Sequence, residues 1–300
     1  MHPSPYLFLA ALAGAPPPAP VFVDVTERAG IGFIHTCGSR EKDYLLEVNG
    51  SGVVLFDADG DGDLDIYFPN GSTLSPAPGA PPARDALYQN LGDWKFRDVT
   101  AAAGLGDARW SCGACAADID NDGDLDLFVA NYGPDVLYQN RGQGRFAERV
   151  DSGTEDPRWG SSCAFGDVDC DGLLDLYVAN YLEFDPAKVH RRGEDPACTY
   201  KGEPVFCGPG GLPASPDSLF INLGGGRFRD ASVEWGVRGV APAYALGVLF
   251  ADVNRDGYPD IFVANDTMPN YLFLNERGRR LRTGAGRFDG CVIILCPSHL

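Results

Sequence analysis

The sequence predicts an all-β protein, a β-propeller of about four to five blades, each a four-stranded antiparallel sheet. Three observations lead to this fold class. An acidic nonapeptide of the form D-x-D-x-D-G-x-x-D recurs four times, with Asn in place of one Asp in the last copy. A short run rich in Val, Phe, Tyr and Leu follows each copy. Sustained helical periodicity is absent from the whole chain, so short strands at regular intervals are expected.

The four acidic segments set the length of the repeat. They are Asp57–Asp65, Asp118–Asp126, Asp167–Asp175 and Asp252–Asp260, and their starts lie 61, 49 and 85 residues apart. A period of about 50–60 residues is typical of propeller blades. The longest interval contains an insertion at 182–216, rich in Pro and Gly, which we expect to form a surface loop.

Each acidic segment has the composition of a calcium-binding loop. So many carboxylates repel one another unless a hard cation lies among them, and calcium prefers an oxygen cage. Side chains at positions 1, 3, 5 and 9 and the carbonyl at position 7 would be ligands, and a Gly at position 6 allows the sharp turn. The predicted ligand positions are Asp57, Asp59, Asp61, Asp63, Asp65, Asp118, Asp120, Asp122, Asp124, Asp126, Asp167, Asp169, Asp171, Leu173, Asp175, Asp252, Asn254, Asp256, Tyr258 and Asp260.

Two other interpretations compete with calcium-binding loops of a blade, and the first of them, an EF-hand, fails on two counts. An EF-hand needs a bidentate Glu at position 12 and a following helix, whereas position 12 here is Phe68, Val129, Val178 or Val263, within strand-like runs. Acidic turns without metal are the other alternative. The loops carry a net charge of −16 out of −18 for the chain, so the charge lies where ligands would be. The fourth loop should bind most weakly, because Asn254 is neutral and Arg255 is cationic.

The remaining strands of each blade follow from two further shared blocks. The first block is Leu87–Asn90, Leu137–Asn140, Leu219–Asn222 and Leu272–Asn275. The second block opens on a Phe and is clearest at Phe96–Thr100, and the same phrase occurs at Phe22–Thr26. The repeat therefore reads strand, calcium loop, strand, turn, strand, turn, strand. Trp94, Trp110, Trp159 and Trp235 occur once per repeat and are predicted to pack within blades rather than to stack on sugars.

The order of these blocks resembles the FG-GAP/VCBS repeats of integrin-like β-propellers. The insertion segment C-T-Y-K-G-E-P-V-F-C-G-P, from Cys198 through Pro209, is similar to one in proteins of the cartilage acidic protein type. The resemblance implies a secreted calcium-binding propeller, usually of seven blades, without established catalytic activity. Four loops are fewer than seven, so an incomplete ring is expected. Of the nine cysteines, Cys198 and Cys207 are the predicted disulfide.

The two ends of the chain differ from the repeats. Residues 1–20 hold a short apolar run and a small-residue cleavage site and are predicted to be a signal peptide. The repeats are assigned to residues 21–276. Residues 277–300 depart from the repeat and are predicted to be a disordered tail.

The predicted function is that of an exported calcium-binding β-propeller, a non-catalytic scaffold for an extracellular protein or glycan. With four histidines and no recognisable nucleophile setting, no catalytic constellation is evident, so the chain is not expected to be an enzyme. A carbohydrate-binding module, or the propeller domain of a glycan-processing enzyme, is the alternative; a hydrolase or lyase using calcium as Lewis acid ranks last. Nucleic acid is not an expected partner, since only the tail is basic. No apolar run reaches the ~18 residues of a membrane span.

Overall fold

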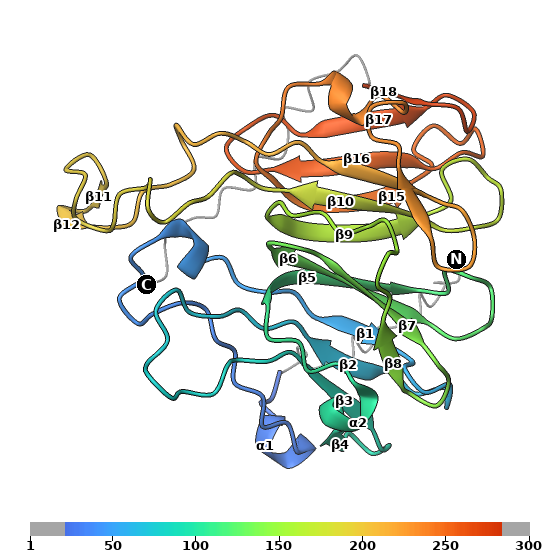
Figure 1. The fold of residues 1–300 in the computed structure, drawn as a ribbon, viewed down its shortest axis with the longest axis horizontal. Helices are drawn as coiled ribbons and strands as arrows, with labels where there is room; N and C mark the ends of the chain where they lie inside the picture. The colour runs from blue at the N-terminus through green and yellow to red at the C-terminus, as the bar shows by residue number, and fades with distance from the viewer. Residues whose placement is uncertain (1–21, 284–300) are drawn as a thin grey trace, which may run out of the picture.

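The computed structural model describes residues 22–283, and these residues form four blades in chain order. Each blade is a four-stranded antiparallel meander in which strands adjacent in sequence are paired (Figure 1). The first blade consists of β1 (Val54–Phe56), β2 (Asp65–Phe68), β3 (Ala86–Asn90) and β4 (Phe96–Asp98). The second consists of β5 (Trp110–Ala117), β6 (Asp126–Tyr132), β7 (Val136–Asn140) and β8 (Phe146–Glu148). The all-β prediction is confirmed.

The third and fourth blades repeat the same order of strands. The third consists of β9 (Gly160–Gly166), β10 (Asp175–Asn180), β13 (Ser218–Asn222) and β14 (Phe228–Asp230), and the fourth of β15 (Ala245–Ala251), β16 (Asp260–Asn265), β17 (Tyr271–Asn275) and β18 (Leu281–Thr283). In every blade the acidic segment joins the first strand to the second, as the sequence predicts.

The blades stack face to face, and their apolar side chains fill the space between sheets. Phe56 and Tyr67 of the first blade pack against Leu127 and Val129 of the second, and similar clusters join the second blade to the third and the third to the fourth. The middle residues of β6 are buried on both faces, which explains their continuous apolar run. Figure 1 shows the first and fourth sheets at opposite ends of the stack, so the described residues form an open array.

The insertion lies at the end of the blades opposite the acidic loops, because it joins the second strand of the third blade to the third strand. Its tip is a short hairpin whose strands, β11 (Thr199–Tyr200) and β12 (Glu203–Pro204), have two residues each. The hairpin extends away from the stack (Figure 1). The disulfide expected between Cys198 and Cys207 is present and closes this hairpin. The insertion is thus an ordered arm rather than a plain loop.

The element expected at Phe96–Thr100 ends sooner than the sequence suggests. The strand stops at Asp98, whose carboxylate accepts a hydrogen bond from the Thr100 amide at 2.9 Å, and the short helix α2 (Thr100–Ala103) begins there. Gly104 ends the helix with φ of 79°. The same phrase near the N-terminus forms α1 (Thr26–Ala29). Single 3₁₀ turns occur as η1 (Leu45–Glu47) and η2 (Val237–Gly239).

The fourth blade continues past residue 276, where the sequence interpretation ended the repeats. Strand β18 pairs with β17, with Leu274 opposite Arg282 and Asn275 opposite Leu281. Arg280 and Arg282 both donate hydrogen bonds to the Glu276 carboxylate. These pairings order residues 277–283, for which a disordered tail was predicted. The predicted signal peptide at 1–20 and the tail from residue 284 lie outside the described residues. Among the residues described, no helix is both long and apolar enough to cross a bilayer.

Candidate metal-binding loops

All four acidic loops adopt one conformation, which the carboxylate at position 1 organises. In the second loop Asp118 accepts hydrogen bonds from the amides of Asp122, at 3.1 Å, and Gly123, at 3.0 Å. Asp57, Asp167 and Asp252 accept from the equivalent amides at 2.9–3.2 Å. The chain is therefore wound around its first carboxylate, with the other acidic side chains gathered nearby.

Two positions in each loop require left-handed backbone. Position 6 is Gly in every loop, with φ of 90–94°. Position 4 is also left-handed and is occupied by Gly60, Asn121, Cys170 and Arg255, with φ of 60–80°. Gly and Asn adopt this region readily, whereas Arg and Cys do so at a cost. Arg255 thus strains the fourth loop as well as adding a positive charge.

The structure brings three carboxylates together in each of the first three loops. One carboxylate oxygen from each of Asp57, Asp59 and Asp61 lies within 4.8 Å of the other two, and the same holds for Asp118, Asp120 and Asp122. In the third loop the group is Asp167, Asp169 and Asp175. No such group of acidic side chains forms in the fourth loop as described, where Asn254 donates to the Asp256 carboxylate at 3.0 Å.

Position 3 provides an oxygen that lacks a protein partner. Asp59 Oδ1 and Asp120 Oδ1 are buried and accept no hydrogen bond from any described residue. Their other oxygens accept from the amide groups of Gln89 and Gln139 respectively. A buried anionic oxygen without a donor is costly unless a cation pairs with it. The carboxylates of these two loops therefore fit a bound cation, and oxygen-only donor sets favour calcium or magnesium over softer metals.

The carboxylate at position 9 also accepts two backbone hydrogen bonds, which the sequence did not predict. Asp126 accepts hydrogen bonds from the Ile119 amide at 3.3 Å and, across the sheet, from the Asn140 amide at 2.7 Å. Asp65, Asp175 and Asp260 make the same pair of bonds. This side chain ties the loop to the third strand of its own blade.

Burial changes the acidity of the position 9 carboxylates. Burial is the main cause that raises the pKa of Asp65 to about 6 and of Asp126 and Asp175 to about 7, against the lowering effect of the backbone amides. The neighbouring carboxylates at positions 3 and 5 raise the pKa of Asp65 and Asp126 further. The raised values therefore reflect mainly the burial of these carboxylates, with a smaller contribution from repulsion between neighbouring acidic side chains.

Position 7 contributes its backbone only. The side chains of Asp63, Asp124, Leu173 and Tyr258 vary in type, and none joins the carboxylate groups described above. In each loop the position 7 amide donates to the carboxylate at position 5, at 2.8–3.0 Å. A ligand role for the position 7 carbonyl stays a prediction.

An Asn from the next blade closes three of the four loops. The Nδ2 group of Asn140 donates to the carbonyl of Ala58 at 3.0 Å, and Asn222 and Asn275 donate likewise to Ile119 and Val168 at 2.8 Å. The acceptor is always position 2 of the preceding blade's loop. These residues form a shared block in the sequence, but only the structure shows that they link blades.

The family model for the FG-GAP-like repeat matches residues 77–129, 118–178 and 205–263, more than half of the chain. The chain belongs to the FG-GAP-like repeat family. The three matched segments contain the second, third and fourth acidic loops.

The solved structures that match this chain do so at low identity and with TM-scores below 0.5. One is an Agrocybe aegerita lectin that recognises non-reducing terminal N-acetylglucosamine, with 18% identity, a TM-score of 0.43 and 76% of this chain covered. The chain spans about half the length of that lectin, 50% of it. Another is the V. cholerae biofilm matrix protein Bap1, with 14% identity, a TM-score of 0.32, 82% of this chain and 41% of that chain covered. No curated protein sequence matches this chain at a significant level.

Proposed function

We propose that the chain is a calcium-binding β-propeller that acts outside the cell as a non-catalytic scaffold for a protein or glycan partner. The observation that carries this proposal is the convergence of acidic oxygens in the repeated loops, with Asp59 and Asp120 each holding a buried oxygen that lacks a donor. A divalent cation would neutralise charge that otherwise repels itself at the junction of the first two strands of a blade.

Calcium would be held by the side chains at positions 1, 3, 5 and 9 and by the carbonyl at position 7. When bound it would supply electrostatic stabilisation rather than chemistry, because a full protein ligand set leaves no position for a substrate. At millimolar calcium and a Kd on the order of 10⁻⁵–10⁻⁴ M, each filled site would stabilise the fold by roughly 1.5–2.5 kcal/mol. The loops are thus structural elements, and no enzymatic role is proposed.

The interaction surface would lie at the end of the blades opposite these loops. There the disulfide-closed insertion projects from the stack, and a cysteine pair of this kind persists in oxidising compartments (Figure 1). The insertion supports placing the chain with proteins of the cartilage acidic protein type. Export also agrees with the calcium proposal, since extracellular calcium is abundant.

Thermal unfolding with and without calcium tests the proposal. We expect 1 mM calcium to raise Tm by several degrees over the same protein in excess chelator, and we expect Asp120→Asn to reduce that rise. Asp93→Asn is the control, because Asp93 is an exposed carboxylate in a blade turn outside the loops. Identical Tm values in calcium and chelator would overturn the proposal.

A further inference from the structure

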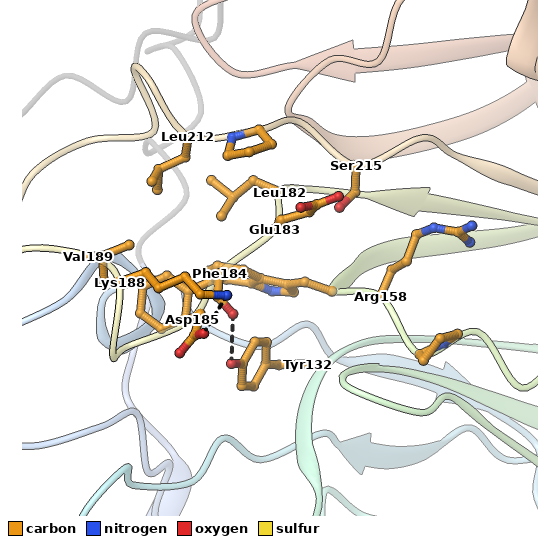
Figure 2. Close-up of a pocket in the computed structure, with 13 residues that line it drawn as sticks. Tyr132, Arg158, Leu182, Glu183, Phe184, Asp185, Lys188, Val189, Leu212 and Ser215 are labelled. Carbon is orange, nitrogen blue, oxygen red and sulfur yellow. Dashed lines mark hydrogen bonds and ion pairs between the residues drawn. The ribbon is translucent and has the colours of Figure 1, made fainter.

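A cavity of about 470 Å³ lies at the base of the insertion, at the end of the blades away from the acidic loops. Its walls come from the second blade (Tyr132), the start of the third (Arg158 and Trp159) and both legs of the insertion (Leu182–Val189 and Leu212–Ser215). Figure 2 shows Leu182, Glu183, Leu212 and Ser215 on one side and Phe184, Asp185 and Lys188 on the other. The volume is typical of small-molecule sites.

Three aromatic residues that pack against one another line part of the cavity: Tyr132, Trp159 and Phe184. Trp159 is 2% exposed and packs edge-on against Tyr132, Tyr181 and Phe184. The Tyr132 hydroxyl donates to the Phe184 carbonyl at 3.0 Å and so attaches the insertion to the second blade. Tyr132 and Phe184 are only half-buried, which leaves part of each ring open to a ligand.

The charged groups of the cavity are balanced. Arg158 donates to both oxygens of Asp156 at 2.8 Å, and the Lys188 ammonium lies 3.0 Å from the Asp185 carboxylate. Both cations already have a carboxylate partner, so an anionic ligand would have to compete for them. The Glu183 side chain has no hydrogen bond or ion pair to any described residue and remains free to accept hydrogen bonds.

A second cavity of about 430 Å³ adjoins the first. It shares Phe184, Lys188, Val189 and Leu212 with it and is bounded on its far side by Tyr44 and by the Cys198–Cys207 disulfide. Two cavities that share an aromatic residue can hold two linked units of one ligand. The base of the insertion therefore carries two neighbouring cavities with a shared wall.

We propose that these two cavities bind a neutral saccharide, with one ring in each cavity and the Phe184 ring between them. A pyranose combines an apolar face, which suits the exposed parts of the Phe184 and Tyr132 side chains, with hydroxyl groups that can donate to Glu183 and accept from Lys188. An uncharged ligand also leaves the existing ion pairs of Arg158 and Lys188 intact. This inference rests on the scaffold proposed above and specifies its partner.

Binding of neutral disaccharides to the folded chain tests the proposal. The probes are cellobiose, lactose and chitobiose, followed by saturation-transfer NMR and calorimetry in millimolar calcium. We expect saturable binding of at least one of them and a loss of about tenfold in affinity in Phe184→Ala. Glu183→Gln, which leaves an exposed side chain of nearly the same shape, should weaken binding by about threefold.

The matched control is Trp94→Ala, because Trp94 is another exposed aromatic residue, 78% exposed, in a turn of the first blade. It should leave saccharide binding unchanged. Failure of all three probes to bind the folded chain, or equal binding by the parent and both cavity variants, would overturn the proposal, as would tighter binding of a sulfated disaccharide or an acidic peptide. If the chain binds a saccharide but its Tm is the same in calcium and in chelator, the saccharide site is supported and the calcium proposal is contradicted.

Discussion

The first three acidic loops and the fourth share one backbone conformation, but they differ in what surrounds them. Val253, at position 2 of the fourth loop, is 53% exposed, whereas Val168 and Ile119 at the same position are 0% and 1% exposed. In the inner loops the following blade covers this residue and donates an Asn side chain to its carbonyl. No described blade follows the fourth.

The difference teaches that a loop of this kind is completed by two blades. Its own blade supplies the carboxylates, and the next blade supplies the cover and the cross-blade hydrogen bond. The turn of the second blade even approaches the first loop closely, since a Cβ on Gly144 would lie 3.1 Å from the Cβ of Asp59. The fourth loop, where Asn254 replaces the Asp of the other loops and Arg255 is cationic, is also the loop whose position 2 residue is exposed in the described part of the chain.

The largest effect is expected from removing the position 9 carboxylate of a covered loop. Asp126→Ala leaves the buried amides of Ile119 and Asn140 without an acceptor, which should cost about 3 kcal/mol of unfolding free energy. Asp260→Ala should cost about half as much, since water can reach the exposed Val253 amide. Chemical denaturation of both variants in calcium measures the difference. Equal losses of unfolding free energy in the two variants would show that the following blade does not contribute to the difference.

A second comparison concerns how stability depends on pH in the third and fourth blades, which carry different side chains at one equivalent position. Burial raises the pKa of Asp217 from 3.8 to about 7, although the Asn180 amide and the Tyr177 hydroxyl oppose the rise. The folded state holds this proton more tightly than the unfolded state, so Asp217 makes stability fall as pH rises from about 4 to 7.

Asp217→Asn should remove that fall, because Asn270 already occupies the equivalent place in the fourth blade and accepts from the Asn265 amide at 2.8 Å. The expected result is a variant more stable than the parent at pH 8 and little changed at pH 4. Urea unfolding at several pH values measures it. A parent-like slope in the variant would contradict the assignment.

Matched substitutions at position 2 test directly whether the following blade covers this residue. Val168→Thr places a hydroxyl in a fully buried site between the third and fourth blades and should cost about 1–3 kcal/mol. Val253→Thr, at a half-exposed site, should change stability by less than about 0.5 kcal/mol. Thermal melts of the pair are sufficient, and a large loss in Val253→Thr would indicate that the fourth blade is covered in solution.

The smallest effect is expected from repairing the fourth loop. Arg255→Gly removes a left-handed Arg with φ of 61° and copies Gly60 of the first loop, which should stabilise the fold by roughly 0.5–1 kcal/mol. Combined with Asn254→Asp, it should also tighten the weakest calcium site several-fold. Calorimetry of the double variant would contradict this reasoning if the weakest site were unchanged.

Much of the fold was predictable because it follows from local patterns. The spacing of ligands in Asp118–Asp126 and the apolar run after it define a loop and a strand without reference to the rest of the chain. The link from Asn140 to Ala58 spans 82 residues, and no local pattern encodes it. The exposure of Trp94, against 7%, 2% and 5% for Trp110, Trp159 and Trp235, also depends on neighbours that differ between blades.

Calorimetric titration of the chelator-treated chain with calcium tests the central claim most directly. We expect binding at three loops, those beginning at Asp57, Asp118 and Asp167, and a clearly weaker fourth event that Asp252→Asn abolishes. Fewer than two calcium ions bound per chain would contradict the account of these loops as the cation-filled junctions of the blades.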